Sequence, residues 1–362
     1  MQRTYLHAGL LLVLLVLLAT QGWAGSVIVG DCKAGTKFPT IQAAVNAAPS
    51  GSTIQICPGT YPEQVVIDKP LTVKGISASG AAAARISVPA TGLVPNFTGG
   101  MYGTAAVHLL VHDTTGVTIT NVMIDGTGGN CPAPSGWVGI AYESYSGSIT
   151  ITNVAVKNVG RYPDCWGAAV LSELGGNLTL QNSSIHGFYY GVVSSEGGTA
   201  NITNNLVASG LRGIYVYGAA GPVTINNNTV LDIDAMPGDA AIFVVSAQVP
   251  TTDVTISGNT AEGNTQAGID TDSLANSKIT SNKVSGFRFG MVVFDMITST
   301  IQSNTIRSVD TGVLYGDYGA TGGNTFTKNT VNDAVCGVLL GNVINSTVSP
   351  NTFYNVEETT CN

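Results

Sequence analysis

The sequence predicts an all-β fold, a parallel β-helix in which short coils stack along one axis. Glycine supplies 45 of the 362 residues and charged side chains only 10%, a composition typical of many tight turns rather than of a helical bundle or a disordered chain. Apolar residues alternate with polar ones at period two and the turns are rich in Gly and Asn, which excludes helical solenoids. The third observation is a pattern, IxxNxV, that recurs along the chain.

The repeat has ten successive anchors, separated by 32, 29, 22, 23, 31, 23, 22, 25 and 22 residues. A commonest spacing near 22 with longer exceptions indicates a coil of minimal length that tolerates insertions. Such a coil fits three short strands, each pairing in parallel with its copy about 4.8 Å away in the next coil. The anchors are Ile119, Ile151, Leu180, Ile202, Ile225, Ile256, Ile279, Ile301, Phe326 and Val348.

An asparagine follows the anchor by three residues in seven consecutive coils. Asn tolerates a left-handed bend between two strands, and stacked copies can hydrogen-bond to one another along the axis. We therefore expect a structural ladder rather than a functional site. Its members are Asn205, Asn228, Asn259, Asn282, Asn304, Asn329 and Asn351.

The N-terminus has the features of a secretory signal peptide. Arg3 precedes an apolar run from Ala8 to Ala19, and small residues end at Ala24, where we place the cleavage. The apolar run is too short to span a bilayer comfortably, and no second long run follows. We expect residues 1–24 to be removed and residues 25–362 to form one exported domain without a membrane span.

Six cysteines remain after residue 24, an even number in an oxidising compartment. A zinc site is the alternative, but no CxxC motif occurs and the histidines lie far from the cysteines in sequence. The net charge of −8 and the absence of any Lys/Arg cluster argue against a nucleic-acid partner. Proximity in sequence predicts the disulfides Cys32–Cys57, Cys131–Cys165 and Cys336–Cys361.

The segment from Phe38 to Gly75, FPTIQAAVNAAPSGSTIQICPGTYPEQVVIDKPLTVKG, resembles the N-terminal entry of the right-handed parallel β-helices of the pectin-lyase-like superfamily. The resemblance covers essentially the whole chain after the signal peptide and implies a right-handed solenoid with three sheets. The motif GTYPE, Gly59 to Glu63, recurs in many such proteins and identifies the fold rather than a reaction. In that group a short amphipathic helix covers the open end of the stack. Its apolar face would be Ile41, Ala44, Val45 and Ala48.

The resemblance also implies a substrate on the outer face of the sheet that follows the variable turn. Insertions at 126–138, 157–166 and 232–239 would build a wall beside this sheet. Its strands begin at a glycine or alanine, the next residue points inward, and alternation turns the third and fifth residues outward. Outward carboxylates and aromatic rings suit a sugar, and the predicted binding residues are Glu143, Glu173, Tyr215, Tyr217, Phe243 and Phe294.

The predicted catalytic pair is Asp270 and Asp272, whose Cα atoms would lie roughly 6.6 to 6.8 Å apart on one strand. Carboxyl groups near that spacing fit an inverting glycosidase, with one acid and one base flanking a water. Asp295 and Asp317 occupy the following position in the next two coils and could raise a neighbouring pKa. The alternative is that outward acids merely keep a secreted β-surface soluble.

A lyase scheme is also open, with Arg288 as the catalytic base beside the acids and Arg212 in an equivalent position. It would bring in a calcium ion held by acids; otherwise we expect no cofactor and no metal. No motif of the known catalytic subfamilies occurs: NTD, GHG, RIK, WxDH, RxPxxR, DFIFG, LGRPW and DPHD are all absent. A non-catalytic extracellular or cell-envelope protein that binds glycan or protein therefore remains the competing function. We expect a polysaccharide partner and a monomer.

Overall fold

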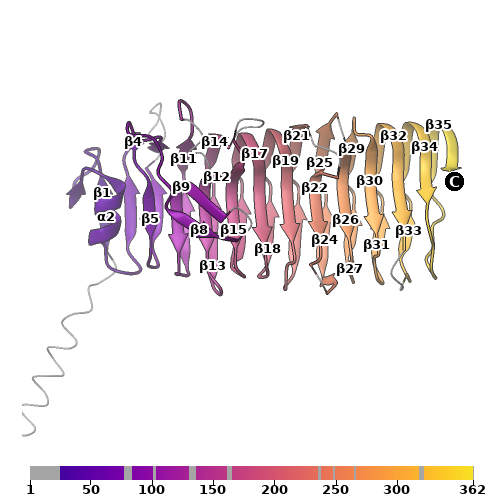
Figure 1. Ribbon diagram of the computed structural model, residues 1–362, viewed down its shortest axis with the longest axis horizontal. Coiled ribbons are helices and arrows are strands. Elements are labelled where there is room, and N and C mark those ends of the chain that lie inside the picture. The colour runs from indigo at the N-terminus through magenta and orange to yellow at the C-terminus, as the bar shows by residue number, and fades with distance from the viewer. Residues whose placement is uncertain are drawn as a thin grey trace, which may run out of the picture.

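The chain folds into a right-handed parallel β-helix whose coils stack along one long axis (Figure 1). The fold class predicted from the repeat is confirmed. The predicted signal peptide, residues 1–24, lies outside the described residues. The computed structural model describes residues 25–76, 84–100, 103–129, 136–160, 165–234, 238–247, 249–264, 266–317 and 322–361.

One face of the solenoid is a 13-stranded sheet in which every pairing is parallel. Its strands carry the anchor residues, and Ile119, Ile151 and their successors stack in register. The strands are β1 (Ser26–Val29), β2 (Lys37–Phe38), β3 (Thr53–Ile56), β6 (Thr72–Gly75), β10 (Val117–Thr120), β13 (Ser148–Thr152), β16 (Asn177–Gln181), β18 (Ala200–Thr203), β20 (Val223–Asn226), β24 (Val254–Ser257), β28 (Lys278–Thr280), β31 (Thr300–Gln302) and β33 (Thr325–Thr327).

A 20-stranded sheet forms the other two faces, because several long strands continue around a bend. Strand β17, for example, pairs with both β14 and β15 of the preceding coil. The strands are β4 (Gly59–Pro62), β5 (Val65–Ile67), β7 (Ala84–Ser87), β8 (Phe97–Gly99), β9 (Gly103–His112), β11 (Val122–Asp125), β12 (Gly136–Glu143), β14 (Ala155–Val159), β15 (Gly167–Glu173), β17 (Ser184–Ser195), β19 (Leu206–Tyr217), β21 (Thr229–Ile233), β22 (Ala240–Val245), β25 (Thr260–Gly263), β26 (Ala267–Asp272), β29 (Lys283–Ser285), β30 (Phe289–Phe294), β32 (Thr305–Gly316), β34 (Thr330–Leu340) and β35 (Thr352–Cys361). Two further short strands, β23 (Thr251–Thr252) and β27 (Leu274–Ala275), pair with each other.

The asparagine ladder forms as expected. Each side-chain amide before the last, such as that of Asn228, donates to the side-chain carbonyl oxygen of the next copy at about 3.0 Å and to the main chain. The expectation that these asparagines make the left-handed bend is wrong. The residue before the ladder position has the positive φ in the first six of the seven coils, as in Asn204 and Asn227, because the ladder residue holds its own N–H in line with the next side chain.

The N-terminal helix α2 (Ile41–Ala47) covers the open end of the stack, as the resemblance implies. Its predicted apolar face is buried in the main core. Glu63 explains the GTYPE motif, because its two carboxylate oxygens accept from the N–H groups of Ile41 and Gln42 at 2.8 and 2.9 Å. These bonds satisfy donors that a helix start otherwise leaves unpaired.

Two of the three predicted disulfides are confirmed. Cys32 bonds to Cys57 and Cys336 to Cys361, fastening a turn at one end and the last strand at the other. Cys131, the expected partner in the third disulfide, lies outside the described residues.

A strap, defined as β8 with Gly100, crosses the outer face of the 20-stranded sheet. Figure 1 shows β8 running obliquely over β12 and β15. Phe97 of the strap packs in an external apolar cluster with Leu110, Ala141 and Leu171, all of which are buried. The strap therefore covers the N-terminal part of the face on which a substrate was expected.

Candidate functional site

Beyond the strap, the same outer face remains open and carries acids and aromatic rings. We call it the acid–aromatic face, made of the outward residues of β19, β22, β26 and β30. Residues at one position of these strands form a column along the axis, because the strands pair in register. The central column runs through Tyr215, Phe243, Asp270 and Val292.

Asp270 and Asp272 both point outward, as the alternation predicted. The residues that flank Asp270 on β26, Ile269 and Thr271, are fully buried, whereas the two acids are partly exposed. Their neighbours in the adjacent coils are apolar. Asp270 lies between Phe243 and Val292 in its column.

The Asp270 carboxyl holds its proton unusually tightly. Burial between apolar neighbours, followed by the negative charges of Asp272 and Asp239, raises its pKa from the ordinary 3.8 to about 7. An acid that merely solubilises a surface needs neither an apolar setting nor a second acid on the same face. The side chain of Asp272 accepts a hydrogen bond from the Ser273 hydroxyl at 2.8 Å.

A second charged group, Arg212, lies near the acids. It forms an ion pair with Asp239, whose side chain is only 4% exposed. Its guanidinium carbon lies 5.0 Å from the ring centre of Tyr190, 4.9 Å from Tyr215 and 5.9 Å from Phe243. A cation held over aromatic faces and paired to a buried carboxylate fixes the orientation of all of these rings.

The aromatic rings form a continuous row. The ring centres of Tyr215 and Phe243 are 5.3 Å apart, those of Tyr215 and Tyr217 are 6.4 Å apart, and those of Tyr190 and Tyr215 are 6.5 Å apart, all nearly parallel. Phe294 extends the face on the other side of Asp272, with which it pairs in register. These predicted binding residues thus share the surface that carries the acids.

Glu143 and Glu173 belong to the same face but lie under the strap. Glu173 is 1% exposed, and Gly100 packs so closely that any side chain there would collide with its carboxylate. Glu143 pairs with His112 at 2.7 Å, and its side chain is 13% exposed. The expectation that both acids lie on an open surface is wrong, because the strap covers them.

Arg288 and Asp295 do not converge on the acid pair. They flank β30 at opposite ends, about 23 Å apart along an extended strand. Arg288 is exposed, with its guanidinium 5.2 Å from the ring centre of Phe289, and Asp295 lies at the turn after the strand with a φ of 49°. The expected assembly of these two residues with Asp270 is therefore wrong.

The expectation that Asp317 lies beside the acid pair and raises a neighbouring pKa is also wrong. It is 1% exposed and accepts hydrogen bonds from the Tyr315 hydroxyl, the Asn324 amide and the Ile344 N–H. It stabilises the last coils from inside. The charges that raise the pKa of Asp270 are those of Asp272 and Asp239 instead.

Asp239 and Tyr190 are the site residues that sequence reasoning missed. Asp239 ends an insertion, 232–239, and directly precedes β22, so the signal was an acid at the junction of a loop and a strand of this sheet. Tyr190 lies three residues before Val193, the column position of β17, and level with Arg212 in register. The middle parts of the other two predicted insertions, residues 130–135 and 161–164, lie outside the described residues.

No cluster of three or more His, Cys, Asp or Glu side chains suited to a metal occurs among the residues that the structure describes. Within the same part of the chain, no helix has the length and apolar character needed to cross a membrane.

The fold resembles solved structures of two carbohydrate enzymes and of a xylose-bound protein at low identity. The A-module of a mannuronan C-5 epimerase from Azotobacter vinelandii shares 16% identity over 88% of this chain and 90% of its own, with a TM-score of 0.65. The catalytic domain of a GH87 α-1,3-glucanase shares 12% over 92% of this chain and 65% of its own, with a TM-score of 0.64. A xylose complex of XylC shares 10% over 91% and 86%, with a TM-score of 0.58.

A search of curated proteins finds no match. The sequence family described as "Right handed beta helix region" matches residues 106–271 and 212–361, which together span more than half of the chain. The register, the ladder and this match agree, and the chain belongs to the right-handed β-helix family.

Proposed function

We propose that the protein hydrolyses a polysaccharide bound along the acid–aromatic face, with Asp270 as the proton donor and Asp272 as the carboxylate that activates water. The observation that carries the proposal is the Asp270 carboxyl, set between apolar neighbours and two residues from a second acid. The epimerase, glucanase and xylose-binding protein of the same fold act on or bind saccharides, which supports a saccharide ligand.

A glycosidic bond breaks when its leaving oxygen receives a proton, so the donor must still hold one near neutral pH. With a pKa of about 7, Asp270 is largely protonated in mildly acidic solution. The apolar side chains of Phe243 and Val292 exclude water from the carboxyl. Loss of water costs the charged carboxylate more free energy than the neutral acid, so the pKa rises. The negative charges of Asp272 and Asp239 act in the same direction.

The spacing of the two acids favours inversion. Residues two apart on a strand place their Cα atoms about 6.7 Å from each other, with both side chains on one face. A gap of about 6.5 to 9.5 Å between carboxyl groups leaves room for the attacking water, whereas a retaining enzyme needs about 5 to 5.5 Å. The partly exposed side chains of Tyr217 and Phe243 would line the surface along which neighbouring sugars lie.

The test is release of reducing ends from a panel of polysaccharides, with and without calcium. Asp270→Asn and Asp272→Asn should each abolish product without lowering the melting temperature. Asp310→Asn is the matched control, since Asp310 is an exposed acid on β32, outside the acid–aromatic face. Product that persists in both site variants would place the chemistry elsewhere.

A lyase is the less favoured reaction, because Arg288 lies just before β30, over Phe289, and Arg212 is already paired with Asp239. The same panel read by absorbance of an unsaturated product distinguishes it from a hydrolase. A calcium requirement would also favour the lyase.

A non-catalytic glycan-binding function is the second candidate, and the row of stacked rings favours it. If no polysaccharide is cleaved but a glycan array shows binding that Tyr217→Ala removes, this function replaces hydrolysis. Tyr354→Ala is the control, since Tyr354 is an aromatic residue 59% exposed on the last strand, β35.

Export completes the proposal. The disulfides Cys32–Cys57 and Cys336–Cys361 suit an oxidising compartment outside the cytosol. We propose that residues 1–24 direct this export and are then removed. N-terminal sequencing of the exported protein would find Gly25 first, and an N-terminus at Met1 would contradict it.

A further inference from the structure

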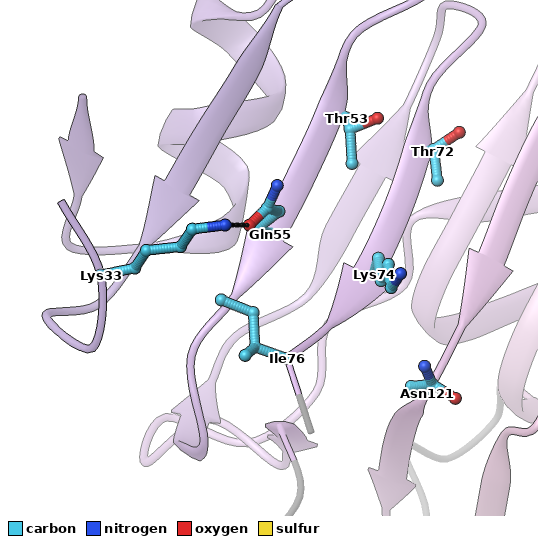
Figure 2. Close-up of a pocket in the computed structure, with 7 residues that line it drawn as sticks. All are labelled: Lys33, Thr53, Gln55, Thr72, Lys74, Ile76 and Asn121. Atoms are coloured by element: carbon cyan, nitrogen blue, oxygen red, sulfur yellow. Dashed lines mark hydrogen bonds between the residues drawn. The ribbon is translucent and has the colours of Figure 1, made fainter. Parts of the chain in front are cut away.

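A second polar site lies far from the acid pair, on the outer face of the 13-stranded sheet. It is a pocket of about 580 Å³ near the N-terminal end, over β3, β6 and the residue that follows β10. Six strand-to-strand steps separate β6 from β24 of the Asp270 coil, which is about 29 Å along the axis. We call it the basic pocket, and Figure 2 shows its lining, which includes Lys33, Thr53, Gln55, Thr72, Lys74 and Asn121.

The position of Lys33 is fixed before any ligand arrives. Its turn is tied to the end of β3 by the disulfide between Cys32 and Cys57, whose Cα atoms are 5.6 Å apart. The Lys33 ammonium donates to the Gln55 carbonyl oxygen at 2.9 Å, as Figure 2 shows, and the Gln55 amide donates to the Ser26 hydroxyl at 2.6 Å. The disulfide holds the turn that carries Lys33, and the hydrogen bonds direct the Lys33 ammonium toward Gln55.

The charge of the pocket is positive in a protein of net charge −8. Lys33 and Lys74 both line it, and no carboxylate is among its lining residues. Neither lysine forms an ion pair within the described part of the chain. The nearest acid in sequence, Asp31, is already paired with Lys37.

The remaining lining suits a sugar. Register places Thr53 beside Thr72 and Gln55 beside Lys74, so hydroxyl, amide and ammonium groups form two adjacent rows. These groups can donate to and accept from sugar hydroxyls, and Ile76 offers an apolar patch. In the later coils the row of Lys74 holds Thr or other uncharged polar residues, so the two lysines distinguish this end of the sheet.

We infer that the basic pocket binds a sugar residue that carries an anionic group, either a carboxylate or a sulfate. The two ammonium groups recognise the anion, and the hydroxyl and amide groups recognise the ring. This site is separate from the proposed hydrolytic face and would hold an acidic stretch of polysaccharide against the N-terminal coils, whether or not the chain is an enzyme.

Isothermal titration with the full chain tests the inference. The probes are a short oligogalacturonate, a sulfated galactan oligomer, a neutral cello-oligosaccharide and a single-stranded oligonucleotide. We expect one or both acidic saccharides to bind, with an affinity that falls as salt rises, and the neutral one not to bind. The carboxylated and sulfated probes decide which anion is preferred.

Lys33→Ala and Lys74→Ala should each weaken binding about twofold to fivefold, the range for an ion pair at an exposed site. Lys278→Ala is the matched control, since Lys278 projects from the same sheet but lies outside the pocket. Melting temperatures of all three variants should equal that of the parent chain. The Asp270→Asn, Asp272→Asn double variant should bind as the parent does, which separates this test from that of the hydrolytic face.

Equal binding of the neutral and acidic probes, or an equal loss in the Lys278 variant, would overturn the inference. So would a titration in which no acidic saccharide binds. Preference for the oligonucleotide would replace the saccharide with a nucleic acid as the ligand.

Discussion

Asp270→Asn should stabilise the protein at neutral and alkaline pH and have little effect in acid. In the folded chain the pKa of Asp270 is about 7, against 3.8 for an ordinary Asp. Below pH 3.8 the carboxyl is protonated in both states, so its full contribution to stability is present. As the pH rises through 7, the folded state must release a proton that it binds more tightly than the unfolded chain does, and stability is lost.

The size of the effect follows from the difference between the two pKa values. About three pKa units correspond to about 4 kcal/mol in the free energy of unfolding, an upper bound because the side chain is partly exposed. Asn does not titrate, so the variant avoids this loss. The charged groups that face Asp270 are Asp272 on the same strand and Asp239, with its partner Arg212, in the preceding coils. The next coil contributes the apolar Val292 and Phe294.

The measurement is the melting temperature of parent and variant from pH 4 to pH 8. The difference between the two at each pH tests the prediction. His108 titrates in the same range, because burial lowers its pKa to about 4, and it costs stability as the pH falls. That contribution is common to both chains and cancels. The variant should gain steadily on the parent between pH 4 and pH 7, whereas Asp310→Asn should show no trend. A flat difference for Asp270→Asn would refute the placement of this carboxyl in an apolar column.

Three further perturbations test the rest of the structure. Arg212→Gln leaves Asp239 buried without its partner and should cost about 3 kcal/mol by chemical denaturation, while Arg307→Gln, at an exposed residue, should cost almost nothing. Asn259→Ala breaks one step of the ladder and should cost about 2 to 4 kcal/mol, which a melting curve within error of the parent would contradict. His108→Phe should remove the loss of stability below pH 6.5 in the same pH series, and a variant that still loses it would exclude His108 as the cause.

The solenoid could be predicted because each of its determinants is local and repeated. Alternating apolar residues in the strand, a glycine at the turn and a ladder asparagine such as Asn228 recur from coil to coil. The direction of Asp270 and Asp272 follows from that alternation alone. The exact bend was misassigned by one residue, because both the bend residue and the ladder residue are commonly Asn.

The strap and the Arg212–Asp239 pair could not be predicted, because neither repeats. The segment from 77 to 105 contains no copy of the motif, so nothing in it shows that Phe97 would cross over β12 and β15. The ion pair joins one strand to an insertion that precedes the strand of the next coil. Sequence spacing is uninformative about a contact whose geometry depends on how a loop folds back.

The strap also explains where on a uniform solenoid a site can exist. Every coil presents a similar outer face, and the N-terminal acids Glu143 and Glu173 have the outward direction that Asp270 has. They differ in what covers them, since Phe97 and Gly100 close off the first coils, whereas Asp270 and Asp272 on β26 remain partly exposed. Within the open part, Asp270 and Asp272 each lie between apolar column neighbours, and desolvation by burial, together with the charges of Asp272 and Asp239, raises the pKa of Asp270. In a fold made of repeats, a reactive group therefore arises where the repeat is uncovered and one polar residue interrupts an apolar column.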